Sequence, residues 1–156
     1  MAERAGWSAS EVARATGPVT ARVDFVAAAE RCSRCGAVLE VCKSRTRTVV
    51  TLSTGAFTAR EVLKQCTRER CGGPVEGSRA LTRVVKTRQR YGYDLIVQVG
   101  LARYLNGKQR EEIRAELERE RGIELSAGTV SALCDRFLLY FEALHDQRAG
   151  ALREAM

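Results

Sequence analysis

This 156-residue chain contains one histidine, and its sequence shows neither a long apolar run nor the pattern of a secretory leader. No uninterrupted apolar run approaches about 18 residues and neither end carries a lipidation motif, so we expect no membrane partner. The N-terminus lacks a basic segment followed by an apolar stretch, which predicts a cytoplasmic protein. Disulfides are rare in that compartment, so the six cysteines should be reduced or should bind a metal. The one histidine, His145, falls on a predicted helical surface and is not expected to be a ligand.

Four of the cysteines form two closely spaced pairs. Two residues separate Cys32 from Cys35, four separate Cys66 from Cys71, and thirty lie between the pairs. Tetrahedral zinc takes four thiolates from two tight chain reversals, although the second pair is wider than the commonest spacing. The spacing therefore predicts one zinc ion per chain, bound by these four residues, with Cys42 left outside as a small hydrophobe. The alternatives are ordinary reduced thiols, or two disulfides in an exported domain.

Between the two pairs the sequence is typical of a β-hairpin. Arg47–Leu52 is rich in β-branched residues, Ser53–Ala56 contains a turn glycine, and Phe57–Gln65 can return as a second strand. Residues 32–75 are therefore expected to form a zinc ribbon, in which Gly36 permits the turn after the first pair. Because four protein ligands leave no open position, the zinc should be structural and not catalytic.

Positive charge is concentrated in the middle of the chain. Residues 32–90 carry thirteen basic and four acidic side chains, whereas residues 91–156 carry nine and eleven. Four thiolates and one zinc ion would leave the middle segment at about +7, a field that favours double-stranded DNA. The alternative is a solvated basic surface. The candidate phosphate contacts lie on one strand face and in a connector at residues 76–90 that has no acid after its first residue: Lys43, Arg45, Arg47, Arg79, Arg83, Lys86, Arg88 and Arg90.

Residues 1–31 should lead into the ribbon. A capping box at residues 8–11 opens a predicted helix of about two turns that ends at Gly17. Apolar and polar residues alternate over residues 19–25, which predicts an extended segment that joins the sheet of the ribbon. Trp7 is expected to be a packing anchor.

Residues 91–156 predict three helices. Apolar spacing indicates helices over residues 94–106 and 108–121, with Gly122 closing the second and Ser126 capping the third. This is the pattern of a helix-turn-helix, whose last helix would meet the major groove through candidate contacts Thr129, Ser131 and Arg136. That helix has few bidentate base readers, and three-helix units that only dimerise are the alternative. The helix also continues with apolar residues on two faces. One face can cover the core of the helix-turn-helix, and the other should bind a partner chain or a missing domain.

These patterns predict an α+β fold: a small zinc-ribbon β-hairpin domain followed by an all-α helix-turn-helix domain with a long C-terminal helix. Two stretches also resemble a known family. Residues 91–156, opening YGYDLIVQVGLARYLNGK, resemble the N-terminal part of bacterial insertion-sequence transposases of the Asp-Asp-Glu type. The segment KSRTRTVVTLSTGAFTAREVLKQC, residues 43–66, is similar to the zinc-binding segment of the same proteins.

The resemblance implies a DNA-binding module that recognises or grips transposon ends. In that family a ribonuclease-H-like domain with metal-binding carboxylates follows the long helix. No position here matches its first catalytic aspartate, so no catalytic residue is carried over. We therefore expect a truncated or split transposase with no enzyme activity and no small-molecule substrate. Its expected partners are double-stranded DNA in the nucleoid and a second copy or a catalytic transposase subunit.

Two other functions are alternatives. One is a protein–protein assembly or dimerisation module, or a transposon-derived regulator, in which the positive charge is incidental. The other is a nuclease, which we disfavour because no carboxylates are expected to converge on an open metal site. The acids of the second predicted helix alternate with arginines and should form a solvated, salt-bridged surface: Glu111, Glu112, Glu116, Glu118 and Glu120.

Overall fold

The structure is a computed structural model that describes residues 21–155. These residues form a three-stranded sheet and four helices, so the expected mixed α+β class is confirmed. The predicted helix that opens at residues 8–11 and the packing role of Trp7 lie outside the described residues. The chain divides into two compact units, with the division after Gly92.

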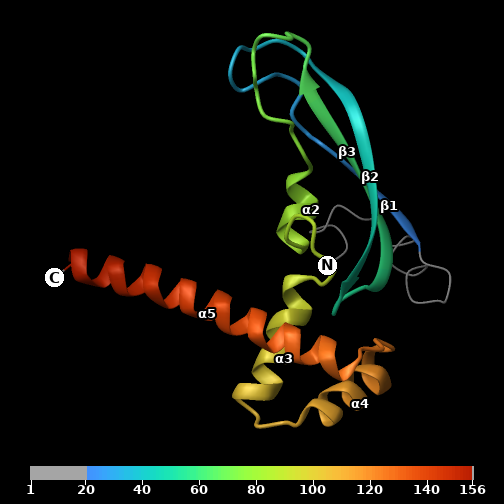
Figure 1. The fold of residues 1–156 in the computed structure, drawn as a ribbon, viewed down its shortest axis with the longest axis vertical. Helices are drawn as coiled ribbons and strands as arrows, with labels where there is room; N and C mark the ends of the chain where they lie inside the picture. The colour runs from blue at the N-terminus through green and yellow to red at the C-terminus, as the bar shows by residue number, and fades with distance from the viewer. Residues whose placement is uncertain (1–20, 156) are drawn as a thin grey trace. The chain divides into compact units, whose positions relative to one another are not determined.

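The first unit is built on a long β-hairpin (Figure 1). β2 (Leu39–Thr51) and β3 (Gly55–Cys66) pair antiparallel, and β1 (Arg22–Val26) lies parallel to β3 on its other side. The hairpin and the joining strand predicted from the sequence are confirmed. β2 begins well before the predicted Arg47, because β3 continues to pair with it as far as Cys66.

One face of this sheet is covered by the short helix α2 (Arg79–Val84), whose first turn is capped by the Ser78 hydroxyl, which accepts from the Leu81 backbone N–H. Leu81 and Val85 lie four residues apart and point to the same side, so both enter the core. The core is a single apolar cluster drawn from all these elements: Val23, Phe25, Val49, Phe57, Ala59, Leu81 and Val85. The basic connector is therefore an integral part of the first unit.

The second unit consists of α3 (Tyr93–Tyr104), α4 (Arg110–Arg121) and α5 (Ala127–Ala155). Gly122 ends α4 with a φ of +62°, as the sequence predicts. Ser126 caps α5, since its hydroxyl accepts from the Thr129 backbone N–H at 3.1 Å. The core contains apolar residues from all three helices and from the α4–α5 turn, including Leu95, Ile96, Val99, Ile113, Leu117, Ile123, Leu125, Val130 and Leu133.

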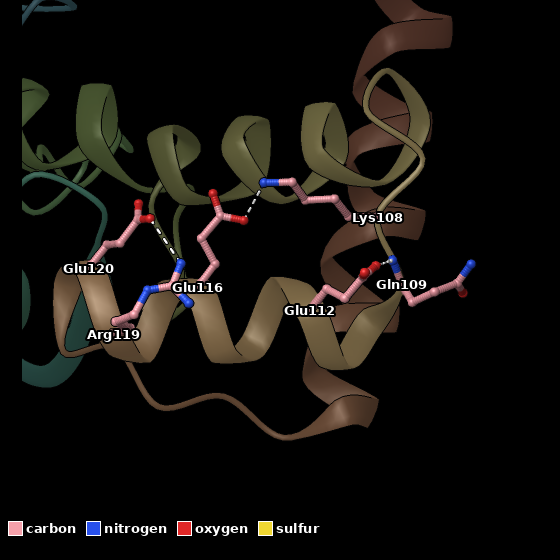
Figure 2. Close-up of polar contacts among 6 residues, drawn as sticks. All are labelled: Lys108, Gln109, Glu112, Glu116, Arg119 and Glu120. Atoms are coloured by element: carbon pink, nitrogen blue, oxygen red, sulfur yellow. Dashed lines mark hydrogen bonds and ion pairs between the residues drawn. The ribbon is translucent and has the colours of Figure 1, made fainter.

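Three acidic residues of α4 have polar contacts within the helix or with the turn before it (Figure 2). Glu116 pairs with Lys108, Glu120 pairs with Arg119, and a Glu112 carboxylate oxygen accepts from the backbone N–H of Gln109 at 2.6 Å. These side chains are partly or largely exposed, so each pair contributes little to stability. The expected salt-bridged surface is present on this helix.

α3 and α5 pack closely at Gly100. A Cβ atom at this position would lie 2.0 Å from Cγ of Phe137, so no side chain larger than hydrogen fits without displacing the ring. Phe137 also stacks on Tyr104, with ring centroids 6.1 Å apart. The contact therefore fixes how the two helices pack against each other.

Gly100→Ala is expected to destabilise the chain by about 1–3 kcal/mol, because Phe137 must leave its place. A glycine in an open helical position behaves in the opposite way, since alanine is favoured there by up to about 1 kcal/mol. Gly150→Ala in α5, where the new Cβ meets no atom within 4 Å, is the matched control. Urea unfolding followed by circular dichroism measures both, and equal midpoints would contradict the close packing.

Candidate metal centre

Four cysteines converge at the open end of the hairpin. Cys32 and Cys35 precede β2, Cys66 ends β3, and Cys71 follows it. Their sulfur atoms all lie within 4.8 Å of one another. Leu39 pairs with Cys66 in the ladder, so the sheet itself brings the two cysteine pairs together. The prediction that these four residues form one group is confirmed.

Each pair is held by a tight turn. In the first, Gly36 has a φ of +72° and donates its backbone N–H to the Cys32 carbonyl at 2.9 Å. In the second, the Cys71 N–H donates to the Arg68 carbonyl at 3.0 Å, and Gly72 has a φ of +59°. Glycine adopts this left-handed conformation without the steric cost that a side chain brings. The glycine after each pair thus allows the chain to reverse.

The distances between the sulfur atoms fit a metal ion. Cys32 Sγ lies 3.7 Å from Cys71 Sγ, and Cys35 Sγ lies 3.5 Å from Cys66 Sγ. A tetrahedron with metal–sulfur bonds of about 2.3 Å has edges of roughly 3.8 Å. Disulfide sulfurs would be about 2.05 Å apart, and all four cysteines are free thiols. The cluster could therefore hold one ion with four protein ligands and no open position.

The electrostatics of the cluster also favour a cation. Backbone N–H groups of Arg34 and Cys35 lower the pKa of Cys32 to about 7. The pKa of Cys71 is instead raised to about 12, chiefly through its hydrogen bond with Cys35, and also through burial. Once one thiolate has formed, its charge opposes ionisation of the others. A divalent cation removes this opposition by interacting with all four sulfurs.

Gly73, which follows the second cysteine pair, lies against the sulfurs of the site, and the sequence did not predict this contact. A Cβ atom on Gly73 would lie 2.9 Å from the Cys32 sulfur and 3.5 Å from the Cys71 sulfur. Nearby, the Arg34 guanidinium donates to the Gly72 carbonyl at 3.1 Å and links the two turns. The double glycine directly after Cys71 was the available signal, because two adjacent glycines indicate close approach of the backbone to another group.

The other two cysteines and the histidine lie outside the cluster. Cys42, expected to pack as a small hydrophobe, is exposed at a bulge in β2 and donates to the Leu63 carbonyl at 3.5 Å. The bulge inserts an extra residue, which turns the thiol out of the regular alternation. Cys134 is buried in α5, which raises its pKa, and His145 is exposed on the same helix.

Lys43 and Arg45 are exposed on the sheet face that carries α2. With Arg79 they line a groove of about 380 Å³. Glu61 also lines this groove, and its carboxylate accepts from the Ser78 backbone N–H at 3.3 Å. The groove is therefore basic, with one carboxylate held at its wall.

The remaining basic candidates separate into two groups. The cations of the connector are all exposed: Arg79, Arg83, Lys86, Arg88 and Arg90. Arg47 is half-buried instead, and its guanidinium donates to the backbone carbonyls of Lys86 and Gln89 at 3.2 and 2.7 Å. Burial lowers the pKa of Arg47, and the carboxylate of Glu61 opposes that shift. The structure thus places Arg47 inside the first unit, holding the connector.

The candidate base readers of α5 contact their own unit. The Thr129 hydroxyl lies 2.9 Å from the Ser126 hydroxyl, and Ser131 accepts from the Arg110 guanidinium at 3.1 Å. Arg136 is half-buried, and its Nη1 is enclosed with no hydrogen-bond partner among the described residues. The exposed positions next to these residues are Gly128, Ala132 and Asp135. The start of α5 therefore offers few groups that could read bases.

No family model matches this chain, and neither curated proteins nor solved structures give a match. Among residues 21–155 there is no helix long and apolar enough to cross a bilayer. Function must therefore be argued from the side chains themselves.

The wild-type chain is expected to bind one metal ion tightly. The Cys35→Ser variant is expected to lose this ion, because three thiolates do not complete the tetrahedral site. The sheet of the first unit should unfold with the loss. Cys42→Ser is the matched control, with the same chemical change in the same hairpin but outside the cluster. Elemental analysis and circular dichroism measure the outcome. Equal metal content in Cys35→Ser and wild type would contradict the assignment.

Proposed function

We propose that residues 21–92 form a DNA-binding module in which a zinc ion closes a zinc ribbon and exposed cations grip phosphates. The observation that carries the proposal is the position of these cations. The first unit fixes the basic connector to its sheet through Leu81 and Val85, yet leaves the cationic side chains outside. Seven candidate contacts are exposed on this unit: Lys43, Arg45, Arg79, Arg83, Lys86, Arg88 and Arg90.

Zinc is the proposed ion because the donors are four sulfurs. Tetrahedral thiolate sites in proteins hold zinc or iron, and a closed set of this spacing is typical of structural zinc. The apolar cluster beneath α2 does not extend to the four cysteines, so an ion would hold together the end of the hairpin that this cluster leaves out. Zinc therefore acts here as a fold-stabilising ion, and no chemistry is assigned to it.

DNA is the proposed polyanion for two reasons. Phosphate contacts from lysine and arginine supply most of the sequence-independent affinity of DNA-binding proteins, and the first unit displays such side chains without matching acids in the connector. The resemblance to the N-terminal portion of insertion-sequence transposases points to the same partner. In this proposal the chain is the end-binding part of a truncated or split transposase.

The second unit has a smaller role in this proposal. α4 and α5 follow the order of a helix-turn-helix, which would orient the chain on the duplex. The base readers Thr129, Ser131 and Arg136 are engaged or enclosed within the unit, so we assign most of the affinity to the first unit. Recognition of transposon ends is accordingly a weaker component than the grip on phosphates.

Charge reversal of Arg83, Lys86 and Arg88 to glutamate is expected to weaken binding to a duplex of about 20 base pairs by at least about 100-fold. The slope of log affinity against log salt should also flatten by roughly 3, since three phosphate contacts are lost. The control reverses Arg119, Arg121 and Arg153 in the second unit, which gives the same net charge. Fluorescence anisotropy at several salt concentrations measures both.

Two results would contradict this proposal at different levels. Equal affinity of the wild-type chain for transposon-end and unrelated duplexes at moderate salt would remove the end-recognition component. A wild-type chain with bound metal that does not bind any duplex at low salt would remove the DNA-binding function itself.

The second candidate function is self-assembly, favoured by apolar side chains exposed on α5 and at the end of α3: Leu101, Tyr104, Leu105, Leu138, Leu139, Phe141 and Leu144. Phe137 stacks on both Tyr104 and Phe141 and so connects the two groups. The exposed area of these side chains is on the order of 700 Å² per chain, near the 800 Å² that each partner buries in a standard interface. We propose a second copy as the occupant, because one such patch can pair with itself across a two-fold axis.

Leu144→Asp is expected to weaken self-association by at least about tenfold, because a charge replaces an apolar side chain in the contact. Ala143→Asp introduces the same charge at the neighbouring exposed position and is the matched control. Light scattering after size-exclusion chromatography measures the mass of each variant. A wild-type chain that stays monomeric at tens of micromolar would contradict this function. The charge reversals in the first unit should leave the mass unchanged.

A further inference from the structure

A tight turn at residues 86–89 has an unusual backbone. The Gln89 N–H donates to the Lys86 carbonyl at 2.9 Å, and Arg88 between them has a φ of +64°. Arg88 is the one non-glycine residue with a positive φ in the part of the chain that the structure describes. Glycine would adopt this conformation without steric cost. An arginine held there indicates a use for its side chain.

The turn is fixed at both ends. The guanidinium of Arg47, on β2, donates to the Lys86 and Gln89 carbonyls at once. Before the turn, Val85 is fully buried in the core. After it, the Arg90 carbonyl accepts from the Val50 N–H at 2.9 Å, and the Gly92 N–H donates to the Val50 carbonyl at 2.8 Å. The side chains of the turn are therefore presented from a rigid base.

These side chains are cationic and exposed. Lys86, Arg88 and Arg90 all face solvent. The Arg90 guanidinium lies over the ring of Tyr91, 5.7 Å from its centroid. The Arg88 side chain is exposed and has neither an ion pair nor a hydrogen bond with any of residues 21–155. Its guanidinium is therefore available to a ligand.

We propose that Arg88 enters the minor groove of duplex DNA, with a preference for narrow A·T-rich segments, while Lys86 and Arg90 contact phosphates on either side. This inference rests on the proposed DNA-binding function. A narrow minor groove has an enhanced negative potential, and arginine is more weakly hydrated than lysine, so it loses less water on entering. A turn that is already rigid adds little ordering cost. Arg47 acts as a positioning residue that sets the turn.

Arg88→Lys tests insertion because it keeps the charge. The full zinc-loaded chain is titrated into two labelled duplexes of equal length, one with a central A-tract and one with G·C steps there. Wild type is expected to prefer the A-tract by about tenfold. Arg88→Lys should lose this preference but keep the affinity for the G·C duplex and the salt slope. Arg83→Lys, a neighbouring exposed cation with an ordinary backbone, is the matched control and should keep the preference.

Two further variants separate positioning from folding. Arg47→Lys keeps the charge but cannot hold both carbonyls with a planar fork, so it should reduce the A-tract preference without changing the salt slope. Arg88→Gly relieves the left-handed backbone, so it should raise the midpoint of thermal unfolding and still abolish the preference. A variant that is more stable than wild type yet has no preference cannot owe its loss to unfolding.

The outcomes that would overturn the inference are distinct from those that bear on the proposed function. Binding of both duplexes by wild type with equal affinity would show contact with phosphates only. A wild-type preference in Arg88→Lys would show that the preference does not come from the Arg88 guanidinium. Either result overturns groove insertion and leaves the DNA-binding function in place. No binding of either duplex by the zinc-loaded chain would overturn the proposed function and this inference together.

Discussion

Four sulfur atoms within 4.8 Å of one another cannot all be negative unless a cation lies among them. This constraint determines much of the first unit. The cluster closes the end of the hairpin where Leu39 pairs with Cys66, and the hairpin carries every other element of the unit. An ion that binds the folded cluster and not the unfolded chain adds its binding free energy to folding.

The same unit combines this cysteine cluster with many basic side chains, and the two groups have different surroundings. Backbone N–H groups of the turns serve the sulfurs, whereas the arginines of the connector are turned to solvent. Arg47 is the exception, since it works inside the fold and holds the turn that carries Arg88. A rigid cationic surface binds a polyanion with less loss of side-chain and loop entropy than a mobile basic tail would.

The second unit is organised by apolar contacts. Four acids of α4 pair with a nearby basic side chain or accept from the backbone at the start of the helix. Its long helix instead leaves apolar side chains exposed past the crossing at Gly100. A helical segment of this kind is marginally stable alone in water, which is the physical reason to expect a partner along it. The DNA binding and the self-assembly that we propose thus involve different units, and the two functions are compatible in one protein.

The sequence by itself determined the features that depend on local chemistry. The cysteine spacing, the β-branched hairpin, Gly36, Gly122 and the Ser126 cap were all readable because turn and cap geometry depends on residues a few positions apart. Only the tertiary structure decided that α2 belongs to the core of the sheet, that Cys42 is exposed at a bulge, and that Arg47 donates to a turn far along the chain. These outcomes depend on which distant segments share a sheet face, and no local pattern encodes that register.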